Sequence, residues 1–267
     1  MMLQNLRDVC DKYKEDNPLS PDAFFSSGKV HLMIGETKLA ESFSEMVIHE
    51  KDNTVSSEAR EEFLTAIKDI RKGMALINGI DEEMTYFSLA KAGYYSDYYE
   101  QPYIYELIKM IRNTEKIRDV EDVRFYSLIY ILNGNADYGV GFLKNHKTAV
   151  AGPKGALFMA AAEKLGNNFT NAILINKEII KSSPGSDAGK IAHLNLGKIY
   201  YHKSLYNESL YHLTEAAKLD ENDFSIQLWI GKSFYKAGDR KKAELVWKTI
   251  LQKDKENVDA KKLLGGI

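Results

Sequence analysis

Two consecutive blocks of 34 residues near the end of the sequence carry the same pattern. The first block spans 190–223 and the second spans 224–257, with no residue between them. A period of this length is typical of a helix–turn–helix unit, which buries its apolar faces by stacking on a copy of itself. The repeat therefore predicts a stack of helical hairpins. The matched pairs are Leu196 with Ile230, Gly197 with Gly231, Tyr200 with Phe234, Leu213 with Trp247, and Ala216 with Ile250.

Small and capping residues predict where the helices cross and turn. Gly197 and Gly231 lack a side chain, so two helices can approach closely at these positions. In the second block, Gly238 is expected to end one helix and Asp239 to cap the next. The first block has the dipeptide Ser204-Leu205 at the same place, which predicts the same turn with less favourable residues.

Both blocks resemble the tetratricopeptide repeat, or TPR. They carry its small residue in the first helix, the aromatic residue that follows it and the apolar stripe of the second helix. The resemblance implies an all-α fold, a right-handed superhelix of antiparallel helix hairpins. Weaker copies of the pattern extend it over most of residues 21–257. We expect hairpins to begin at Pro21, Asp81, Asp119, Pro153, Lys190 and Phe224.

Composition changes along the chain predict its domain organisation. Residues 1–20 read as an N-terminal helix, and 21–148 as irregular TPR-like hairpins with one long extra helix at about 55–80. Residues 149–257 read as regular TPR hairpins, and 258–267 as a C-terminal capping helix. The most loop-like stretch, NHKTAVAGPKG, lies between the two hairpin regions.

The overall charge excludes few functions, but its distribution is uneven. The 267 residues have a net charge of −2, which gives no general attraction to nucleic acid or membranes. Residues 1–120 have a net charge of −7 and residues 121–267 one of +5. This asymmetry reflects either solvated helix surfaces or two different binding faces.

The ends and the cysteine content indicate a cytoplasmic protein. The only cysteine, Cys10, excludes an internal disulfide and fits a reducing compartment. The first residues are charged and amphipathic, unlike a signal peptide, and no stretch is long and apolar enough to cross a membrane. We therefore expect cytoplasmic localisation and no membrane insertion.

The sequence shows no pattern that predicts catalysis. His193, His202 and His212 are nine and ten residues apart, which is poor spacing for metal ligands within one hairpin. The segment PGSDAGKI has a phosphate-loop appearance, but its glycines are too close and Ile191 replaces the required hydroxyl residue. We expect no enzyme activity, no cofactor and no metal site.

Seven tyrosines lie between Tyr86 and Tyr105. Tyrosine combines a large rigid ring with a polar tip, so this group suits a recognition surface. The alternative is that the rings pack the seams between helices. The sequence leaves both interpretations open.

The TPR resemblance also implies where a partner would bind. In that family the first helices of successive hairpins line a concave groove that holds an extended peptide or a helix. Lysines in such a groove suit an acidic partner segment, and aromatic rings supply apolar contact. The positions carried over are Lys198, Tyr201, His202, Lys232, Tyr235, Lys236, Phe25 and Lys29.

These observations predict a scaffold or adaptor for protein–protein interaction. We expect the partner to be another protein, bound through a peptide or helix in the groove, possibly an acidic segment, and we expect no nucleic-acid partner. The alternative is a structural or assembly subunit that self-associates through the tyrosine-rich and terminal hairpins, so a homo-oligomer is an open possibility.

Overall fold

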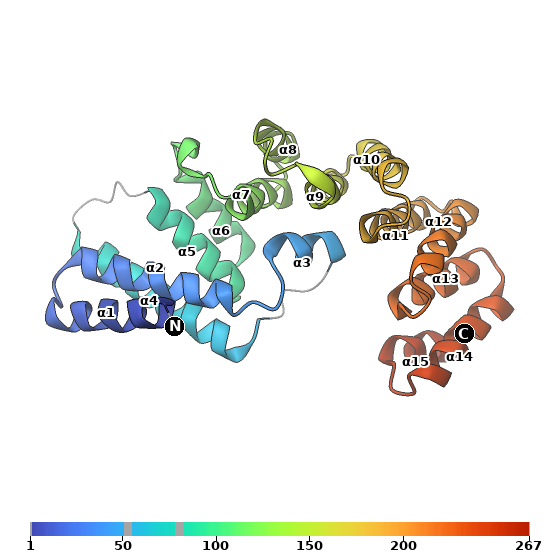
Figure 1. Cartoon of the computed structure of the whole chain (residues 1–267), viewed down its shortest axis with the longest axis horizontal. Helices are drawn as coiled ribbons and strands as arrows, with labels where there is room; N and C mark the ends of the chain where they lie inside the picture. Colours follow the sequence, from blue (N-terminus) through green and yellow to red (C-terminus); the bar gives the residue numbers. More distant parts are fainter. Residues whose placement is uncertain (1, 51–54, 78–82, 267) are drawn as a thin grey trace. The chain divides into compact units, whose positions relative to one another are not determined.

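The computed structural model describes residues 2–50, 55–77 and 83–266, and throughout that part the regular secondary structure is helical (Figure 1). The all-α prediction is confirmed. The chain divides into two compact units, Met1–Ala149 and Val150–Ile267, each of which is described separately below. In the described residues, no helix has the length and apolar character needed to cross a membrane.

The first unit contains eight α-helices and one short 3-10 helix in its described residues. Its elements are α1 (Met2–Asp16), α2 (Pro21–Thr37), α3 (Phe43–His49), α4 (Ser57–Leu76), α5 (Glu83–Tyr95), α6 (Gln101–Lys109), η1 (Thr114–Lys116), α7 (Val120–Leu132) and α8 (Ala136–Asn145). The hairpin start predicted at Asp81 and the end of the block 21–54 lie outside the described residues.

The second unit is a series of antiparallel hairpins that follow one another along the chain (Figure 1). Helix α9 pairs with α10, α11 with α12, and α13 with α14, while α15 packs on α14. The helices are α9 (Gly152–Leu165), α10 (Phe169–Ser182), α11 (Asp187–His202), α12 (Tyr206–Leu219), α13 (Phe224–Lys236), α14 (Arg240–Lys253) and α15 (Val258–Gly265).

The two glycines of the 34-residue repeat lie where the helices of a hairpin cross. A side chain at Gly197 would collide with Leu213 of α12, and one at Gly231 would collide with Trp247 of α14. Each large residue fills the space that the glycine leaves. The repeat therefore predicted these crossings correctly.

The turns inside these hairpins share one geometry. Each first helix is followed by a residue in the left-handed region, at φ 62° for Asn167, 60° for Ser204 and 91° for Gly238. The next amide then bonds to a carbonyl in the last turn of the first helix, which satisfies a free helix-end acceptor. The bonds run from Asn168 N to Glu163 O at 2.8 Å, from Leu205 N to Tyr200 O at 2.9 Å, and from Asp239 N to Phe234 O at 2.9 Å.

Apolar residues join each hairpin of the second unit to the next element. One buried cluster connects α12 with α13 and another connects α14 with α15, so the core is continuous along this series of helices. The first cluster contains Leu213, Ala216, Ile226 and Ile230, and the second contains Ala243, Trp247, Ile250 and Ala260.

The first unit pairs its helices differently from the sequence prediction. The block 21–54 suggested a hairpin of α2 with the segment that follows it, but α2 packs along the 20-residue helix α4. Side chains added at Gly28 and Gly35 would meet Ile70 and Phe63 of α4 at 2.7 and 2.6 Å. Helix α3 has only seven residues, too few to cover the apolar face of α2.

The tyrosine-rich segment mainly packs the interior of the first unit. Tyr95 is 3 % exposed, and Tyr94 makes edge-to-face contacts with Phe43 and Phe125. Of the seven tyrosines, Tyr98 and Tyr103 are the two that are exposed, each with about half of its surface accessible. Seam packing is therefore the main role of these rings.

Candidate partner-binding site

Trp229 of α13 lies between two lysine side chains of successive hairpins. The Lys232 ammonium is 4.4 Å from the centre of a Trp229 ring, and the Lys198 ammonium of α11 is 5.6 Å away. A cation over an indole face is attracted by the negative face of the ring. Trp229 thus holds two positive charges close together on half-buried surface.

Two further rings of α11 contact Trp229 at its edges. Tyr201 packs edge-to-face with a centroid separation of 5.2 Å, and His202 does so at 5.8 Å. Tyr201 also packs against Tyr206, the first residue of α12, at 5.9 Å. The turn of the α11–α12 hairpin therefore meets the middle of α13 in an aromatic patch, and two lysines lie over its tryptophan.

Lys164, in the last turn of α9, adds a third lysine to this region. Burial and, to a smaller extent, the charge of Lys198 together lower the pKa of Lys164 to about 8. Burial also lowers the pKa of Lys198 to about 8. The pKa of His202 is lowered by burial and then by Lys164, Lys198 and Lys232, which shows that all three ammonium groups act on one imidazole.

We name the set Lys164, Lys198, Tyr201, His202, Trp229 and Lys232 the Trp229 cluster. Two acidic residues act on it: Asp223 raises the pKa of Lys198, and Asp259 raises that of Lys232. Neither reverses the effect of burial, since the pKa of both lysines stays below its ordinary value. Burial therefore affects the pKa of these two lysines more than the neighbouring carboxylates do.

The structure brings together half of the residues predicted to line a groove. Lys198, Tyr201, His202 and Lys232 belong to the Trp229 cluster. Tyr235 instead packs against Trp247 at 6.1 Å and beneath the Arg240 guanidinium at 5.6 Å, and Lys236 is exposed at the end of α13.

The two predicted groove residues of α2 lie in the first unit. Phe25 is 4 % exposed, and its ring fills the space beside Gly73 of α4, so its surface is used in the core. Lys29 is exposed on the same helix. The register carried over from the second unit predicted Phe25 in the groove. Because α2 packs along α4, the Phe25 ring lies in the interior instead.

The sequence prediction missed Lys164 and Trp229. Lys164 was overlooked because three extra residues shift its hairpin from the 34-residue register. Counting back from the turn corrects this, since Lys164 precedes the left-handed Asn167 by as many residues as Tyr201 precedes Ser204. No comparable signal identifies Trp229, which occupies a position taken by Asn195 in the previous hairpin.

Comparison with solved structures identifies the fold. A tetratricopeptide repeat protein from Parabacteroides merdae matches with a TM-score of 0.55 and 13 % identity, over 98 % of this chain and 97 % of that one. The chain has the tetratricopeptide-repeat fold.

TTC0263 from Thermus thermophilus, a thermophilic TPR protein, matches 69 % of the chain with a TM-score of 0.47 and 14 % identity, and covers 97 % of its own length. MamA from Desulfovibrio magneticus matches 67 % with a TM-score of 0.48 and 13 % identity, and covers 98 % of its own length. No family model and no curated protein sequence matches the chain.

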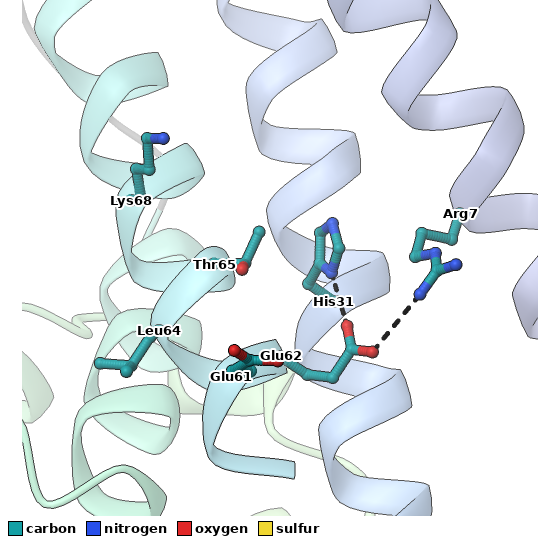
Figure 2. Close-up of a pocket in the computed structure, with 7 residues that line it drawn as sticks. All are labelled: Arg7, His31, Glu61, Glu62, Leu64, Thr65 and Lys68. Carbon is teal, nitrogen blue, oxygen red and sulfur yellow. Dashed lines mark hydrogen bonds and ion pairs between the residues drawn. The ribbon is translucent and has the colours of Figure 1, made fainter. Parts of the chain in front are cut away.

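A second polar site lies beside the TPR-like helices of the first unit. A cavity of 480 Å³ is lined by residues of α1, α2 and α4. Figure 2 shows Glu62 facing both His31 and Arg7 at this cavity. The Glu62 carboxylate lies 2.7 Å from His31 Nδ1 and 3.5 Å from Arg7 Nη1. These two contacts connect α1, α2 and α4, and they provide partners for the buried carboxylate of Glu62.

Next to this cavity, three residues have the donor atoms of a metal site. Carboxylate and imidazole atoms of Asp11, His31 and Asp69 lie within 4.8 Å of one another. The Lys14 ammonium binds Asp11 at 3.0 Å and Asp69 at 2.8 Å, and Ser27 donates to Asp69 at 2.7 Å. Lys14 thus supplies the cation that these carboxylates need, which makes the network a structural one.

Proposed function

We propose that this protein is an interaction scaffold whose second unit binds an acidic segment of a partner protein at the Trp229 cluster. The carrying observation is the group of Lys198 and His202 of α11 and Lys232 of α13 in contact with Trp229, with Lys164 of α9 near Lys198 and His202. Like charges on half-buried surface repel one another, and an anionic ligand would relieve that repulsion.

The charge of the whole second unit supports this choice of partner. Residues 150–267 contain 18 lysines and arginines against 13 aspartates and glutamates, a net charge of +5. Such an excess attracts acidic segments and speeds their association.

The aromatic residues suit a peptide rather than a free small anion. Trp229 and Tyr201 present half-buried rings beside the lysines, so a bound segment gains apolar contact as well as ion pairs. Tryptophan and tyrosine are the residue types that contribute most often to binding energy at protein interfaces.

Titration with a fluorescently labelled, Glu-rich synthetic peptide tests the proposal. Replacement of Lys164, Lys198 and Lys232 by glutamine should weaken binding by at least tenfold at low salt, and the wild-type affinity should fall with rising salt. Lys236→Gln is the matched control, because this exposed lysine lies in the same unit but outside the cluster. Equal affinity of the triple variant and the wild type would refute the proposal.

Self-association is the second candidate, supported by the half-exposed rings of Tyr98 and Tyr103 in the first unit. Light scattering over a concentration series distinguishes it from partner binding. A molar mass of one chain at all concentrations would exclude this alternative.

A further inference from the structure

The second helices of the three hairpins in the second unit share one exposed apolar position. Leu174 of α10, Tyr211 of α12 and Leu245 of α14 each follow the left-handed turn residue of their hairpin by seven residues. Each of these three residues is between 55 and 66 % exposed. Because stacked hairpins are copies of one unit, residues at the same position face the same side of the series. We name Leu174, Tyr211 and Leu245 the apolar ladder.

A cavity adds an apolar socket at the α14 end of the ladder. Its volume is 250 Å³, and its lining includes Leu245 itself, Phe224 of α13, and Val246 and Ile250 of α14. Single exposed apolar residues are common on protein surfaces, but a regular row of them beside an apolar cavity is typical of an interaction surface. The ladder and its socket therefore suit the apolar face of a partner.

Helix α1 of the first unit presents its apolar residues to solvent and its polar residues to the other helices. Arg7 and Lys14 point inward and pair with carboxylates of α4 at 3.5 and 2.8 Å. The exposed apolar residues recur at intervals of four and three along one face, and each is between 41 and 81 % exposed. An amphipathic helix normally buries such a face. We name these four residues the α1 stripe: Met2, Leu6, Val9 and Tyr13.

The α1 stripe and the apolar ladder match in length. From Met2 to Tyr13 the stripe extends over about 16 Å, because a helix rises about 1.5 Å per residue. Packed helices lie about 8–10 Å apart, so a row across three successive second helices extends over roughly 20 Å. A single helix that crosses α10, α12 and α14 can therefore contact the whole ladder with one face.

The charges of the two surfaces indicate which occupant fits the ladder. Helices α10, α12 and α14 contain eight basic and four acidic residues, whereas α1 contains three basic and four acidic residues. The first unit as a whole has 18 basic and 25 acidic residues. Opposite charge favours contact of α1 with the ladder, and like charge disfavours a symmetric pair of α1 helices. A lipid surface attracts helices with a basic polar face, which α1 lacks.

We infer that the α1 stripe of one copy of this protein docks on the apolar ladder of a second copy. The contact joins two different surfaces, so each pair still has one open stripe and one open ladder, and longer assemblies form as the concentration rises. The inference is independent of the proposed peptide binding, because no residue of the Trp229 cluster takes part. It also uses a different surface from Tyr98 and Tyr103.

Sedimentation velocity of the untagged full chain over a concentration series tests the contact. The mean mass of the wild type should rise with concentration. Leu6→Gln with Val9→Gln disrupts the stripe, and Tyr211→Gln with Leu245→Gln disrupts the ladder, both without a change of charge. Each double variant alone should associate at least tenfold more weakly than the wild type. An equimolar mixture of the two should form a two-chain complex, because one supplies the ladder and the other the stripe.

Leu219→Gln is the matched control, since this exposed leucine of α12 lies outside the ladder and its replacement should leave association unchanged. Three outcomes would overturn the inference. They are a wild-type mass of one chain at every concentration, undiminished self-association of the ladder variant, as a symmetric α1 pair would give, and no complex in the mixture. Thermal melting followed by circular dichroism confirms that each variant is folded, so that a lost association is assigned to the missing surface.

Discussion

Single residues in the left-handed region end the first helix of each hairpin in the second unit. Glycine adopts this backbone conformation without strain, whereas for a residue with a side chain it costs about 1 kcal/mol of conformational free energy. Gly238 and Ser204 occupy the same place in the two copies of the repeat, at φ 91° and 60°. The chain therefore contains a favourable and an unfavourable version of one turn.

Exchanging these two residues should change stability in opposite directions. Ser204→Gly should raise the free energy of unfolding by about 0.5–1 kcal/mol, and Gly238→Ser should lower it by about 1 kcal/mol. Urea denaturation followed by circular dichroism measures both. Shifts of the same sign would show that the turn conformation is not the cause.

The lysines of the Trp229 cluster should reduce stability while they serve binding. Lys198→Met should raise the free energy of unfolding at pH 7 by about 1 kcal/mol, a value reduced from the pKa shift because the side chain is partly exposed. The folded-state pKa of about 8 lies below the unfolded value, so the penalty is complete below pH 8 and disappears towards pH 10.5. Thermal unfolding at both pH values tests this, and a gain that persists unchanged at high pH would contradict it.

At the scale of elements, α1 is attached to the first unit by polar contacts. None of its residues is buried, and Lys14 connects it to the buried carboxylate of Asp69. Asp11 of the same helix accepts a bond from Ser27 of α2 at 3.0 Å. Such an attachment depends on charge, in contrast to the apolar packing between α12 and α13.

Removing the charge of Lys14 should release α1. Lys14→Met leaves Asp69 without its ammonium partner, which is costly for a buried carboxylate. Amide hydrogen exchange in α1 should become at least tenfold faster, with little change in the second unit. Lys12→Met, an exposed lysine on the same helix, is the control and should leave protection unchanged. Equal protection in both variants would contradict the prediction.

Acid should also weaken the ion pair that joins Arg7 of α1 to Glu62 of α4 at 3.5 Å. Burial alone would raise the pKa of Glu62, but its bonds to His31 and Lys38 outweigh burial and lower it. Stability from a carboxylate with a lowered pKa is present above pH 4.5 and is lost as pH falls through the folded-state value. Exchange in α1 measured at pH 6 and pH 3.5 should show this release first in α1, and simultaneous loss in α13 would argue against it.

The elements also show what sequence alone can predict. The constant 34-residue period predicted the hairpins, crossings and turns from 190 to 257, because each position could be compared with its counterpart in the other block. The pairing of α2 with α4 was missed, since periodicity does not show which of two following helices is long enough to cover an apolar face. The hydrogen bond of 3.1 Å between the Nδ1 atoms of His193 in α11 and His212 in α12 was missed because it depends on how the two helices are rotated about their axes.

For the candidate site, the TPR resemblance predicted that Lys198, Tyr201, His202 and Lys232 line a groove, and in the structure each of the four side chains contacts Trp229. It could not predict Trp229 as the central ring, because that position carries an asparagine in the preceding hairpin. The position of a residue within the repeat predicts the direction of its side chain more reliably than it predicts which residue that side chain contacts.

At the scale of the whole molecule, the charges are divided between the two units. The first unit, 1–149, contains 18 basic and 25 acidic residues, and the second, 150–267, contains 18 and 13. Partner binding through the second unit should therefore be sensitive to both salt and pH. The pKa of about 8 for Lys164 and Lys198 sets the pH range in which charge is lost.

The affinity for a Glu-rich peptide at pH 7 and pH 9.5 tests the central claim most directly. An anion raises the pKa of nearby lysines, so binding should be strong below pH 8 and weaken above it, by roughly tenfold at pH 9.5. The double variant Lys164→Arg and Lys198→Arg keeps both charges at pH 9.5 and should retain its affinity. The same loss of affinity in the wild type and the arginine variant would contradict the assignment of the Trp229 cluster as the binding site.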